Sequence, residues 1–390
     1  MRSRDRLLRM MYNYIRMTLI AIEAARPNRP QKTGTEWYGY HVIQNMKKIA
    51  DPRDQFILYT NKALHSGLEE MPADNWQEKI LKWPLPRFWT QGRLSLEMLF
   101  KSPDVLYIPA HAMPIIHPAK TVVTLHDVGF ERYPELYSKP DLWYHRWSAK
   151  FVINQAAKII TVSNFSKQEL IDLYNAPAEK IHVTHLGYDH ERYKVIQDRK
   201  KIDLVLEKYN IKKPYIFYIG RLDKKKNIPL LVEAFARFKQ ENKGDPHSLV
   251  LIGRPGFEYE KIKQTVEKYN IQKWVIETGW IPEVEVPYIY NGATCFVFPS
   301  SYEGFGIPLL EAMASGTPVL ASRAASIPEV GQDAVMYFNT HEVESLTRGL
   351  AKILQDQDLR AVLREKGFQR VKNFSWRRTA QQTLDILKSV

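Results

Sequence analysis

Two glutamates, Glu303 and Glu311, are the residues whose type and spacing most clearly suggest chemistry. They lie in segment 298–322, FPSSYEGFGIPLLEAMASGTPVLAS, with residues 304–310 between them. The segment reads as the end of a strand, a glycine loop, an apolar helix over 307–315 and a second strand. A carboxylate in an apolar helix is costly to bury unless it binds something. We therefore expect a polar ligand here rather than two ordinary surface acids.

The loop between the two glutamates is suited to close backbone contact with that ligand. Gly304 and Gly306 flank Phe305, and glycine lets the main chain approach a bound molecule. Pro308 suits the first turn of the following helix, and Gly316 suits the position just past its end. Free amides at a helix start attract anions. The segment thus predicts a ligand that lies close to the main chain and carries negative charge.

A second candidate site is the basic turn at 220–227, GRLDKKKN, which follows a predicted strand. Arg221 can form a planar fork to two oxygens, and Lys226 supplies a point charge. Glycine, arginine and lysine at a strand-to-helix turn suit a diphosphate. The alternative interpretation is a solvated charged turn, because basic loops are common.

Two further positions lie in the N-terminal half. His126 and Asp127 follow an apolar strand, at the end where doubly wound sheets bind ligands. A histidine held by a backbone group is the alternative. Gly34, in Thr33-Gly34-Thr35, lies between the first predicted strand and a helix, another frequent ligand position, although one glycine is a weak signal alone.

Composition limits the class of protein. The chain has 390 residues, which favours two domains, and its apolar and charged fractions are those of a globular protein. The single Cys295 excludes an internal disulfide framework and fits a reducing compartment. The net charge of +13 suits nucleic acid, an anionic membrane or an anionic substrate. Because the basic residues are scattered and no nucleic-acid motif is present, nucleic acid ranks lowest.

Residues 1–16, MRSRDRLLRMMYNYIR, form a basic extension that also holds Leu, Met and Tyr. Such a segment can lie on an anionic membrane as an amphipathic helix, or it can be a loose extension. A second translational start at Met17 is conceivable. No apolar stretch is long enough to span a membrane, and we see no cleavable signal peptide.

The remaining chain alternates strands and helices, which predicts parallel sheets covered on both faces. We expect an N-terminal domain over 17–195, a linker over 196–212 that ends in a short helix, a C-terminal domain over 213–372 and a terminal helix over 373–390. Predicted strands lie at 18–24, 56–60, 80–83, 105–109, 121–126, 158–162, 182–186, 215–220, 248–253, 274–279, 294–299 and 318–321. Predicted helices lie at 36–49, 91–101, 141–156, 164–174, 228–242, 257–269, 283–291 and 307–315.

Together these motifs resemble glycosyltransferase family 4, the retaining "glycosyl transferases group 1" enzymes of GT-B fold. The resemblance runs from about residue 17 to the end and is most specific at 296–322. The matching pieces are GRLDKKKN (220–227), FVFPSSYEGFGIPLLEAMASGTPVLAS (296–322), IPEVGQDA (327–334), LHDV (125–128), TVSNFSKQEL (161–170), HLGYD (185–189) and FSW (374–376). It implies two Rossmann-like α/β domains facing each other across a cleft, with the C-terminal helix crossing back to the first domain.

The resemblance also implies the donor site. Arg221 and Lys226 would hold the donor diphosphate, Glu311 the ribose hydroxyls, and Glu303 the donor sugar. The amides of Gly304, Phe305 and Gly306 would lie near the sugar hydroxyls. Leu310 and Ile281 would complete the donor pocket, with the base recognised around Trp280-Ile281.

On the acceptor side, the resemblance places His126 close to the transferred sugar and Gly34 near the phosphate and the acceptor. Asp127 would belong to the same side. The loop KTGTEWYGY departs from the more glycine-rich or basic turn of many relatives. We interpret Trp37 and Tyr38 there as residues that shape an acceptor pocket. His126, Glu303, Arg221 and Lys226 are the expected catalytic residues.

The expected activity is transfer of a hexose, with mannose from GDP-mannose as the first candidate and UDP-hexose as another, to a polysaccharide or lipid-linked glycan. Arg221 and Lys226 would stabilise the leaving diphosphate, so no cofactor or metal is expected. The family implies retention, by front-face attack through an oxocarbenium-like state. The alternatives are a nucleotide-sugar epimerase or hydrolase, or an inactive sugar-nucleotide-binding subunit. We expect a cytoplasmic protein, with peripheral contact at the inner membrane face as a further possibility.

Overall fold

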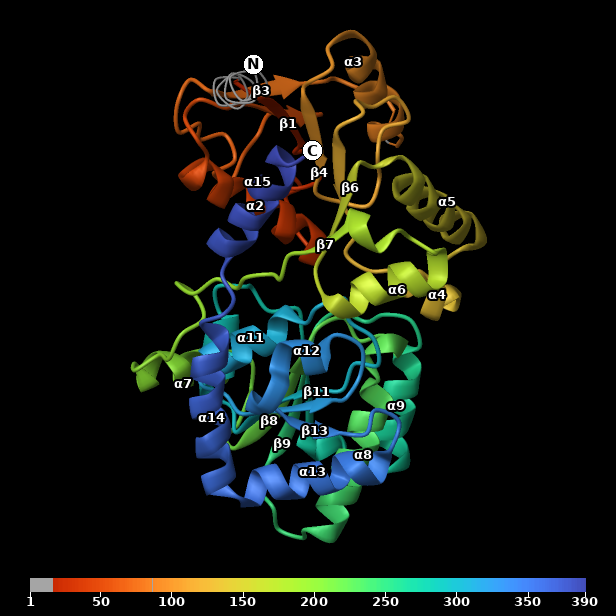
Figure 1. The fold of residues 1–390 in the computed structure, drawn as a ribbon. Helices are drawn as coiled ribbons and strands as arrows, with labels where there is room; N and C mark the ends of the chain where they lie inside the picture. Colours follow the sequence, from red (N-terminus) through yellow and green to blue (C-terminus); the bar gives the residue numbers. More distant parts are fainter. Residues whose placement is uncertain (1–16, 86) are drawn as a thin grey trace, which may run out of the picture.

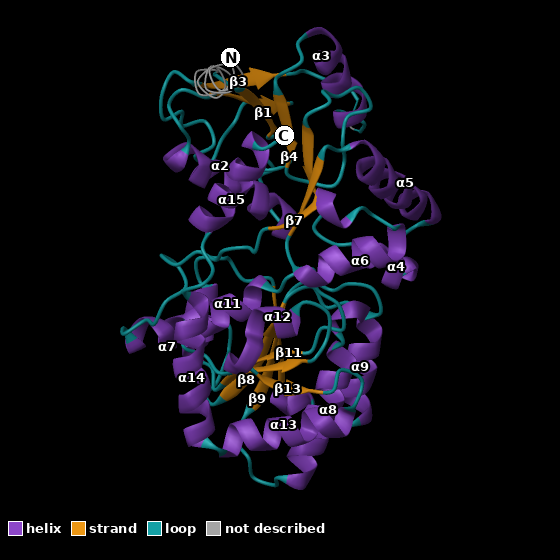
Figure 2. Ribbon diagram, in the orientation of Figure 1, coloured by secondary structure: helices purple, strands orange, loops and turns teal. Residues whose placement is uncertain are grey.

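The structure is a computed structural model that describes residues 17–85 and 87–390. The chain forms two α/β domains, one above the other in Figures 1 and 2, each built on a parallel sheet with helices on its faces. The expected N-terminal membrane helix over 1–16 lies outside the described residues. None of the helices in the described part is long and apolar enough to cross a membrane.

The first domain has seven parallel strands in the order β3-β2-β1-β4-β5-β6-β7. Its central strands are buried on both faces, which their uninterrupted apolar runs predict. The strands are β1 (Leu19–Glu23), β2 (Gln55–Thr60), β3 (Trp76–Ile80), β4 (Val105–Ile108), β5 (Thr121–Thr124), β6 (Lys158–Thr161) and β7 (Ile181–Val183). The α-helices are α2 (Gly34–Ile49), α3 (Ser95–Phe100), α4 (Gly129–Arg132), α5 (Lys139–Gln155) and α6 (Asn164–Tyr174), and a π-helical turn over Thr90–Leu94 precedes α3.

The second domain has six parallel strands in the order β10-β9-β8-β11-β12-β13. The strands are β8 (Tyr215–Ile219), β9 (Ser248–Ile252), β10 (Val275–Gly279), β11 (Cys295–Phe298), β12 (Val319–Ser322) and β13 (Met336–Phe338). The helices are α7 (Arg199–Lys208), α8 (Ile228–Glu241), α9 (Tyr259–Lys268), α10 (Val286–Gly292), α11 (Ile307–Ala314), α12 (Ile327–Gly331), α13 (Val343–Gln355) and α14 (Gln357–Val371).

Several elements differ from the sequence prediction, among them α13 and α14, which were not predicted. The strand expected at 80–83 lies earlier, as β3, because this edge strand reads WQEKI and has no apolar run. β13 was not predicted, since its three residues are too few for a periodic signal. The short helix expected at the end of the linker is present as α7, which packs on α10 and buries Ile202 and Leu206.

The helix α15 (Trp376–Lys388) packs on α2, so the chain returns to the first domain after the second. The crossing is close: a Cβ at Gly187 would lie 2.1 Å from the backbone nitrogen of Trp376. The Trp376 ring stacks on His41 of α2, with ring centroids 4.8 Å apart. Figure 1 shows this dark-blue helix lying beside the red α2. The expected fold class, including the returning helix, is confirmed.

The two sheets face each other through the ends where their strands finish. The loop after β6 contacts the loop after β11, where the Ser163 hydroxyl donates to the carbonyl of Gly304 at 2.7 Å. At the rim, Lys224 after β8 pairs with Glu135 of the first domain at 2.7 Å. Because every strand is parallel, both carboxyl edges meet in this region, which is the ligand position of open α/β sheets.

Candidate active site

Lys226 and Glu303 form the centre of the candidate donor site. Lys226 Nζ lies 2.6 Å from Glu303 Oε1, and both side chains are about 15% exposed. They come from the turns after β8 and β11, which are neighbouring strands in the sheet. The parallel sheet therefore brings together two motifs that are 77 residues apart in the chain.

Glu311 lies in α11 and is only partly exposed. Burial raises the pKa of its carboxyl to about 7, and the negative charge of Glu283 adds to this rise. Hydrogen bonds from the hydroxyls of Tyr290 and Tyr193 partly offset it, with Tyr290 Oη 3.1 Å from Glu311 Oε2. A poorly solvated carboxylate surrounded by hydroxyl donors is a good acceptor for paired ligand hydroxyls.

Glu283 and Arg192 are neighbours of Glu311 that the sequence did not reveal. Arg192 Nη1 lies 2.9 Å from Glu283 Oε2, and this pair links the segment after β7 to the loop before α10. The charge of Glu283 also acts on Lys32 of the first domain, whose pKa is lowered, mainly by burial. No local pattern marks Glu283 or Arg192, because their partners are distant in sequence.

The loop 303–306 is held by its carbonyl groups. The Ser326 hydroxyl lies 2.9 Å from the carbonyl oxygens of both Glu303 and Phe305. The Gly304 carbonyl accepts from Ser163 of the first domain. In a trans peptide the N–H points opposite to the preceding carbonyl. The amides of residues 304–306 are thus turned away from these serines, as a ligand-binding loop requires.

The other predicted donor residues differ in exposure. Arg221 is exposed, and within residues 17–85 and 87–390 its guanidinium has no ion-pair partner. Leu310 and Ile281 are buried, so their side chains belong to the core of the second domain. Trp280 is 60% exposed and lies 6.0 Å from the Arg254 guanidinium.

His126 follows β5 and is nearly buried. Its Nε2 lies 3.0 Å from the carbonyl oxygen of Pro109, which can only accept, so this nitrogen carries the proton. Burial lowers the pKa of His126 to about 4, and the imidazole is therefore neutral near pH 7. A backbone group therefore holds the ring, as the alternative interpretation expects, and the role of His126 beside the transferred sugar stays a prediction.

Asp127 and Gly304 meet directly between the two domains. A Cβ at Gly304 would lie 3.0 Å from Asp127 Oδ2 and 3.2 Å from the carbonyl oxygen of His126. A side chain here would be in tight contact with both residues and would require them to shift slightly. Asp127 Oδ1 also accepts from the backbone of Gly129 at 2.8 Å. The predicted donor loop and the predicted acceptor-side residues are therefore adjacent.

The first turn of α2 gives a mixed result for the acceptor side. Gly34 has open space around the position of a Cβ, and Trp37 is half-buried. Tyr38 is fully buried, and its hydroxyl lies 2.9 Å from that of Tyr107. Its ring packs edge-on against His126 at 4.6 Å. Tyr38 is therefore a core residue that supports His126, and its expected part in shaping an acceptor pocket stays a prediction.

Two first-domain groups were missed by the sequence analysis. Glu36 is buried beside Arg26, with Oε1 3.1 Å from Nε, and it caps the start of α2 together with Thr33. The Thr33-x-x-Glu36 spacing is a capping-box signal that could have identified it. His111 lies 5.3 Å from His126 between ring centroids. Burial and the charge of His126 hold the pKa of His111 well below its usual range.

In 17–85 and 87–390 no three His, Cys, Asp or Glu side chains gather as they would around a metal ion. The positive charges at the site come from Lys226 and Arg221, and Cys295 is a buried free thiol.

Comparison with known proteins places this geometry in a family. The model for "Glycosyl transferases group 1" matches residues 201–370, and that for "Glycosyltransferase Family 4" matches residues 64–192. The chain is 34% identical over 270 residues to O-antigen chain mannosyltransferase B of Escherichia coli, covering 69% of this chain and 70% of that protein.

Solved structures share the fold at low identity. HepE from Anabaena, in a complex with UDP and glucose, superposes with a TM-score of 0.74 at 18% identity, covering 96% of this chain and 100% of that one. Sucrose-phosphate synthase from Thermosynechococcus elongatus gives 0.73 at 19% identity, covering 95% and 98%. The two facing Rossmann-like domains are thus a GT-B architecture. The chain belongs to the group 1, family 4 glycosyltransferases.

Proposed function

We propose that this glycosyltransferase moves a hexose from a nucleotide-sugar donor to a glycan, with Lys226, Glu303 and Glu311 forming the donor site. The observation that carries the proposal is the Lys226–Glu303 pair at a sheet edge that faces His126 and Asp127. A lysine beside a carboxylate can hold a diphosphate and a sugar hydroxyl side by side. Glu311, with its raised pKa, would accept hydrogen bonds from the ribose.

The proposed chemistry needs charge stabilisation at the leaving group. As the glycosidic bond breaks, negative charge grows on the nucleoside diphosphate, and Arg221, Lys226 and the amides at the start of α11 would stabilise it. In this proposal these cations act without a metal. The acceptor hydroxyl attacks from the face that the leaving diphosphate occupies and passes its proton to an oxygen of that diphosphate, which retains the anomeric configuration. The neutral His126 would orient the transferred sugar rather than donate a proton.

For the donor we propose mannose from GDP-mannose, and for the acceptor a polysaccharide or lipid-linked glycan. The support is the similarity to an O-antigen chain mannosyltransferase over about 70% of both chains. A UDP-hexose is the second candidate for the donor. The free, buried Cys295 suits the reducing cytoplasm, where we propose that the enzyme works.

The test is a thermal-shift screen with GDP-mannose, UDP-glucose and ADP-glucose, followed by product analysis with and without glycan acceptors. A preferred donor should raise the melting temperature by mass action. Acceptor-dependent formation of a new glycoside supports transfer. Free sugar or an epimer without acceptor would instead indicate a hydrolase or epimerase, and donor binding without any product would indicate an inactive subunit.

We further propose that the first domain rests on an anionic membrane surface. Around α3, segments 80–100 and 115–116 contribute half of the sixteen exposed large hydrophobic side chains among the described residues: Ile80, Leu85, Phe88, Leu96, Leu99, Phe100, Ile115 and Ile116. The two segments are adjacent, because the Ser95 hydroxyl accepts from the amide of Ile115 at 2.9 Å. Residues 79–120 hold six Lys and Arg but only two acids, a balance that suits anionic lipid.

Vesicle sedimentation tests the membrane proposal. The full chain should bind phosphatidylglycerol-rich vesicles more strongly than pure phosphatidylcholine vesicles. The L99E/F100E double variant should bind about tenfold less. L204E, at a 65% exposed position on α7 of the second domain, is the matched control and should bind like the wild type. Equal binding by all three chains would exclude this surface, and no binding by the wild type would exclude the membrane.

A further inference from the structure

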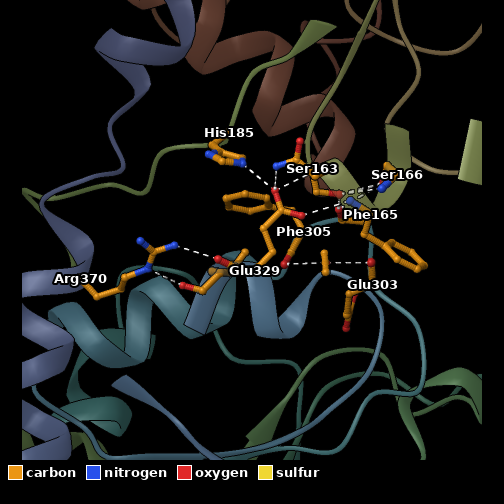
Figure 3. A network of polar contacts seen from close by, with 12 residues as sticks. Ser163, Phe165, Ser166, His185, Glu303, Phe305, Glu329 and Arg370 are labelled. Carbon is orange, nitrogen blue, oxygen red and sulfur yellow. Dashed lines mark hydrogen bonds and ion pairs between the residues drawn. The ribbon is translucent and has the colours of Figure 1, made fainter. Parts of the chain in front are cut away.

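Two sequence motifs that have no role in the donor or acceptor chemistry bind each other across the domain boundary. Segment 161–170 forms the end of β6 and the start of α6 in the first domain. Segment 327–334 forms α12 and the turn after it in the second domain. Figure 3 shows their side chains converging beside the donor loop, with Glu329 in the middle.

Glu329 binds the first turn of α6 through its carboxylate. Its Oε1 accepts from the backbone amide and the side-chain amide of Asn164, each at 2.8 Å, and its Oε2 accepts from the amide of Phe165 at 3.1 Å. His185 Nε2 lies 2.7 Å from the same Oε1. Ser163 caps the next free amide, that of Ser166, at 3.0 Å. The helix start is thus satisfied jointly by its own domain and by the other domain.

The electrostatics of this contact favour a charged Glu329. Burial alone would raise the pKa of the carboxyl, but the hydrogen bonds from His185 and from the amides of Asn164 and Phe165 outweigh it and hold the pKa below its usual value. A helix N-terminus carries partial positive charge, which a carboxylate stabilises. A charged group with a lowered pKa at an interface is one whose partners stabilise its ionised form.

Arg370 of α14 fixes the position from which Glu329 reaches across. Its guanidinium donates to the backbone carbonyls of Glu329 and Val330, each at 2.8 Å. These bonds hold α12, a short helix of five residues, against the long α14. Glu329 therefore extends from a supported backbone rather than from a free loop, and Figure 3 shows the guanidinium on the opposite side of Glu329 from α6.

The same short segments hold the donor loop. Ser326, one residue before α12, binds the carbonyls of Glu303 and Phe305. Ser163, one residue before α6, binds the carbonyl of Gly304. When Glu329 joins α12 to α6, both serines are brought onto successive carbonyls of one loop. The contacts of Glu329 with α6 join the two domains, and we call them the clasp. The shape of the donor loop depends on the same contacts.

We propose that Glu329 is a positioning residue, which holds the N-terminus of α6 against the donor loop. The closed arrangement of the two domains and the orientation of the loop amides then form together. Glu329 lies behind the loop and acts through Ser163, Ser326 and the loop carbonyls. The group that it acts on is the set of amides at 304–306, which the proposed function assigns to the donor sugar. On that assumption, Glu329 makes transfer dependent on domain closure.

Hydrogen exchange and small-angle X-ray scattering of the full chain test the clasp without any substrate. In Glu329→Gln and Glu329→Ala, the amides of Asn164 and Phe165 should exchange at least about tenfold faster, and the radius of gyration should rise. Glu342→Gln is the matched control, because it removes the same charge within the second domain, where its partner is Asn339. Unchanged exchange and scattering in both Glu329 variants would overturn the proposal, as would equal changes in the control.

A second experiment measures transfer from GDP-mannose to the glycan acceptor that the product analysis identifies. Glu329→Gln should lower kcat by about tenfold, with a smaller effect on KM for the donor, and it should raise the share of donor lost to hydrolysis. A purely structural role would leave that share unchanged in the folded fraction, which would overturn the positioning role. This experiment rests on the proposed function. If no donor is turned over, the exchange and scattering results still decide whether the clasp exists.

Discussion

Lys226 Nζ lies 2.6 Å from Glu303 Oε1, although the two residues come from different strand-to-helix turns. In this position Lys226 can bind Glu303 when the donor is absent and a donor diphosphate when it is present. A donor diphosphate that binds Lys226 would compete with Glu303 for its protons, and the carboxylate would then be available to a sugar hydroxyl. Because the pair is only about 15% exposed, this exchange would take place with little screening by water.

Lys226→Ala should lower kcat/KM for transfer by about a hundredfold or more, because loss of a preorganised charge at a leaving group typically has this effect. The neighbouring Lys225→Ala is the control. Its side chain has no ion-pair partner among the described residues, and this variant should keep near-normal kinetics. Steady-state kinetics with thermal melts checks both. Near-normal turnover by a folded Lys226→Ala enzyme would contradict the site assignment.

Glu311→Gln should stabilise the protein at neutral and alkaline pH. The folded pKa of about 7 lies above the ordinary value of 4.5, so the folded state binds more protons between these values. The wild type therefore loses stability as the pH rises from 4.5 to 7, by at most about 3 kcal/mol. Urea unfolding of both chains at pH 4.5 and 8 measures the difference. If the difference in the free energy of unfolding between the two chains did not increase from pH 4.5 to pH 8, the raised pKa would be contradicted.

Glu311→Gln should weaken donor binding even though it stabilises the protein. An ionised Glu311 should bind ribose hydroxyls better than a protonated one, so wild-type affinity for GDP should weaken as the pH falls below about 7. Glu311→Gln should bind GDP at least about tenfold more weakly at pH 8, with a flatter pH dependence. Isothermal titration calorimetry checks this. Equal affinity of the two chains at pH 8 would argue against ribose contact.

Buried histidines give a pH effect of opposite sign. Burial lowers the pKa of His126 and of His41 to about 4, below the ordinary 6.5. The unfolded state therefore binds more protons between these values, and stability falls as the pH drops from 6.5 to 4, by about 2 kcal/mol per histidine at pH 5. His126→Asn and His41→Gln should each reduce this loss in urea unfolding. His190→Asn, at an exposed position, should not, and an equal effect there would contradict the prediction.

Two glycine substitutions should have different outcomes. A Cβ at Gly304 would crowd Asp127 and the His126 carbonyl, so Gly304→Ala should lower transfer at least about tenfold and destabilise the protein by about 1–3 kcal/mol. A Cβ at Gly34 meets nothing within 4 Å, so Gly34→Ala should fold normally. If the acceptor binds there, KM for the acceptor should rise while KM for the donor stays the same. Unchanged acceptor kinetics would place the acceptor elsewhere.

Local sequence predicted the parts of the site that lie within one turn or helix. Glu303, Gly304 and Glu311 follow from one strand–loop–helix segment, and the basic turn with Lys226 follows from a second. Each pattern contains its own strand end and helix start, so the sheet places it at the carboxyl edge without further information. The terminal helix expected over 373–390, from an amphipathic run, is likewise a local pattern, and it corresponds to α15.

Contacts between segments were not predictable in this way. Nothing near Glu329 indicates that it binds the amides of Asn164 and Phe165, which are about 165 residues away. The Glu283–Arg192 pair was not predictable for the same reason, because its two residues are far apart in the sequence. The edge strand β3 was misplaced for a related reason, since its polar side chains face solvent and leave no apolar run. Such features depend on how the two domains and the sheet edges finally meet.

The return of α15 to the first domain has a consequence for synthesis of the chain. α15 packs on α2 and buries Trp376, Leu384 and Leu387, and it follows every described strand of both domains along the chain. The first domain is therefore made early but lacks this covering helix until the second domain has been made. The second domain, except for its contacts across the boundary, has all its described strands before that point. We expect the second domain to become protease-resistant first during synthesis, with the N-terminal half depending on chaperones until α15 has been made.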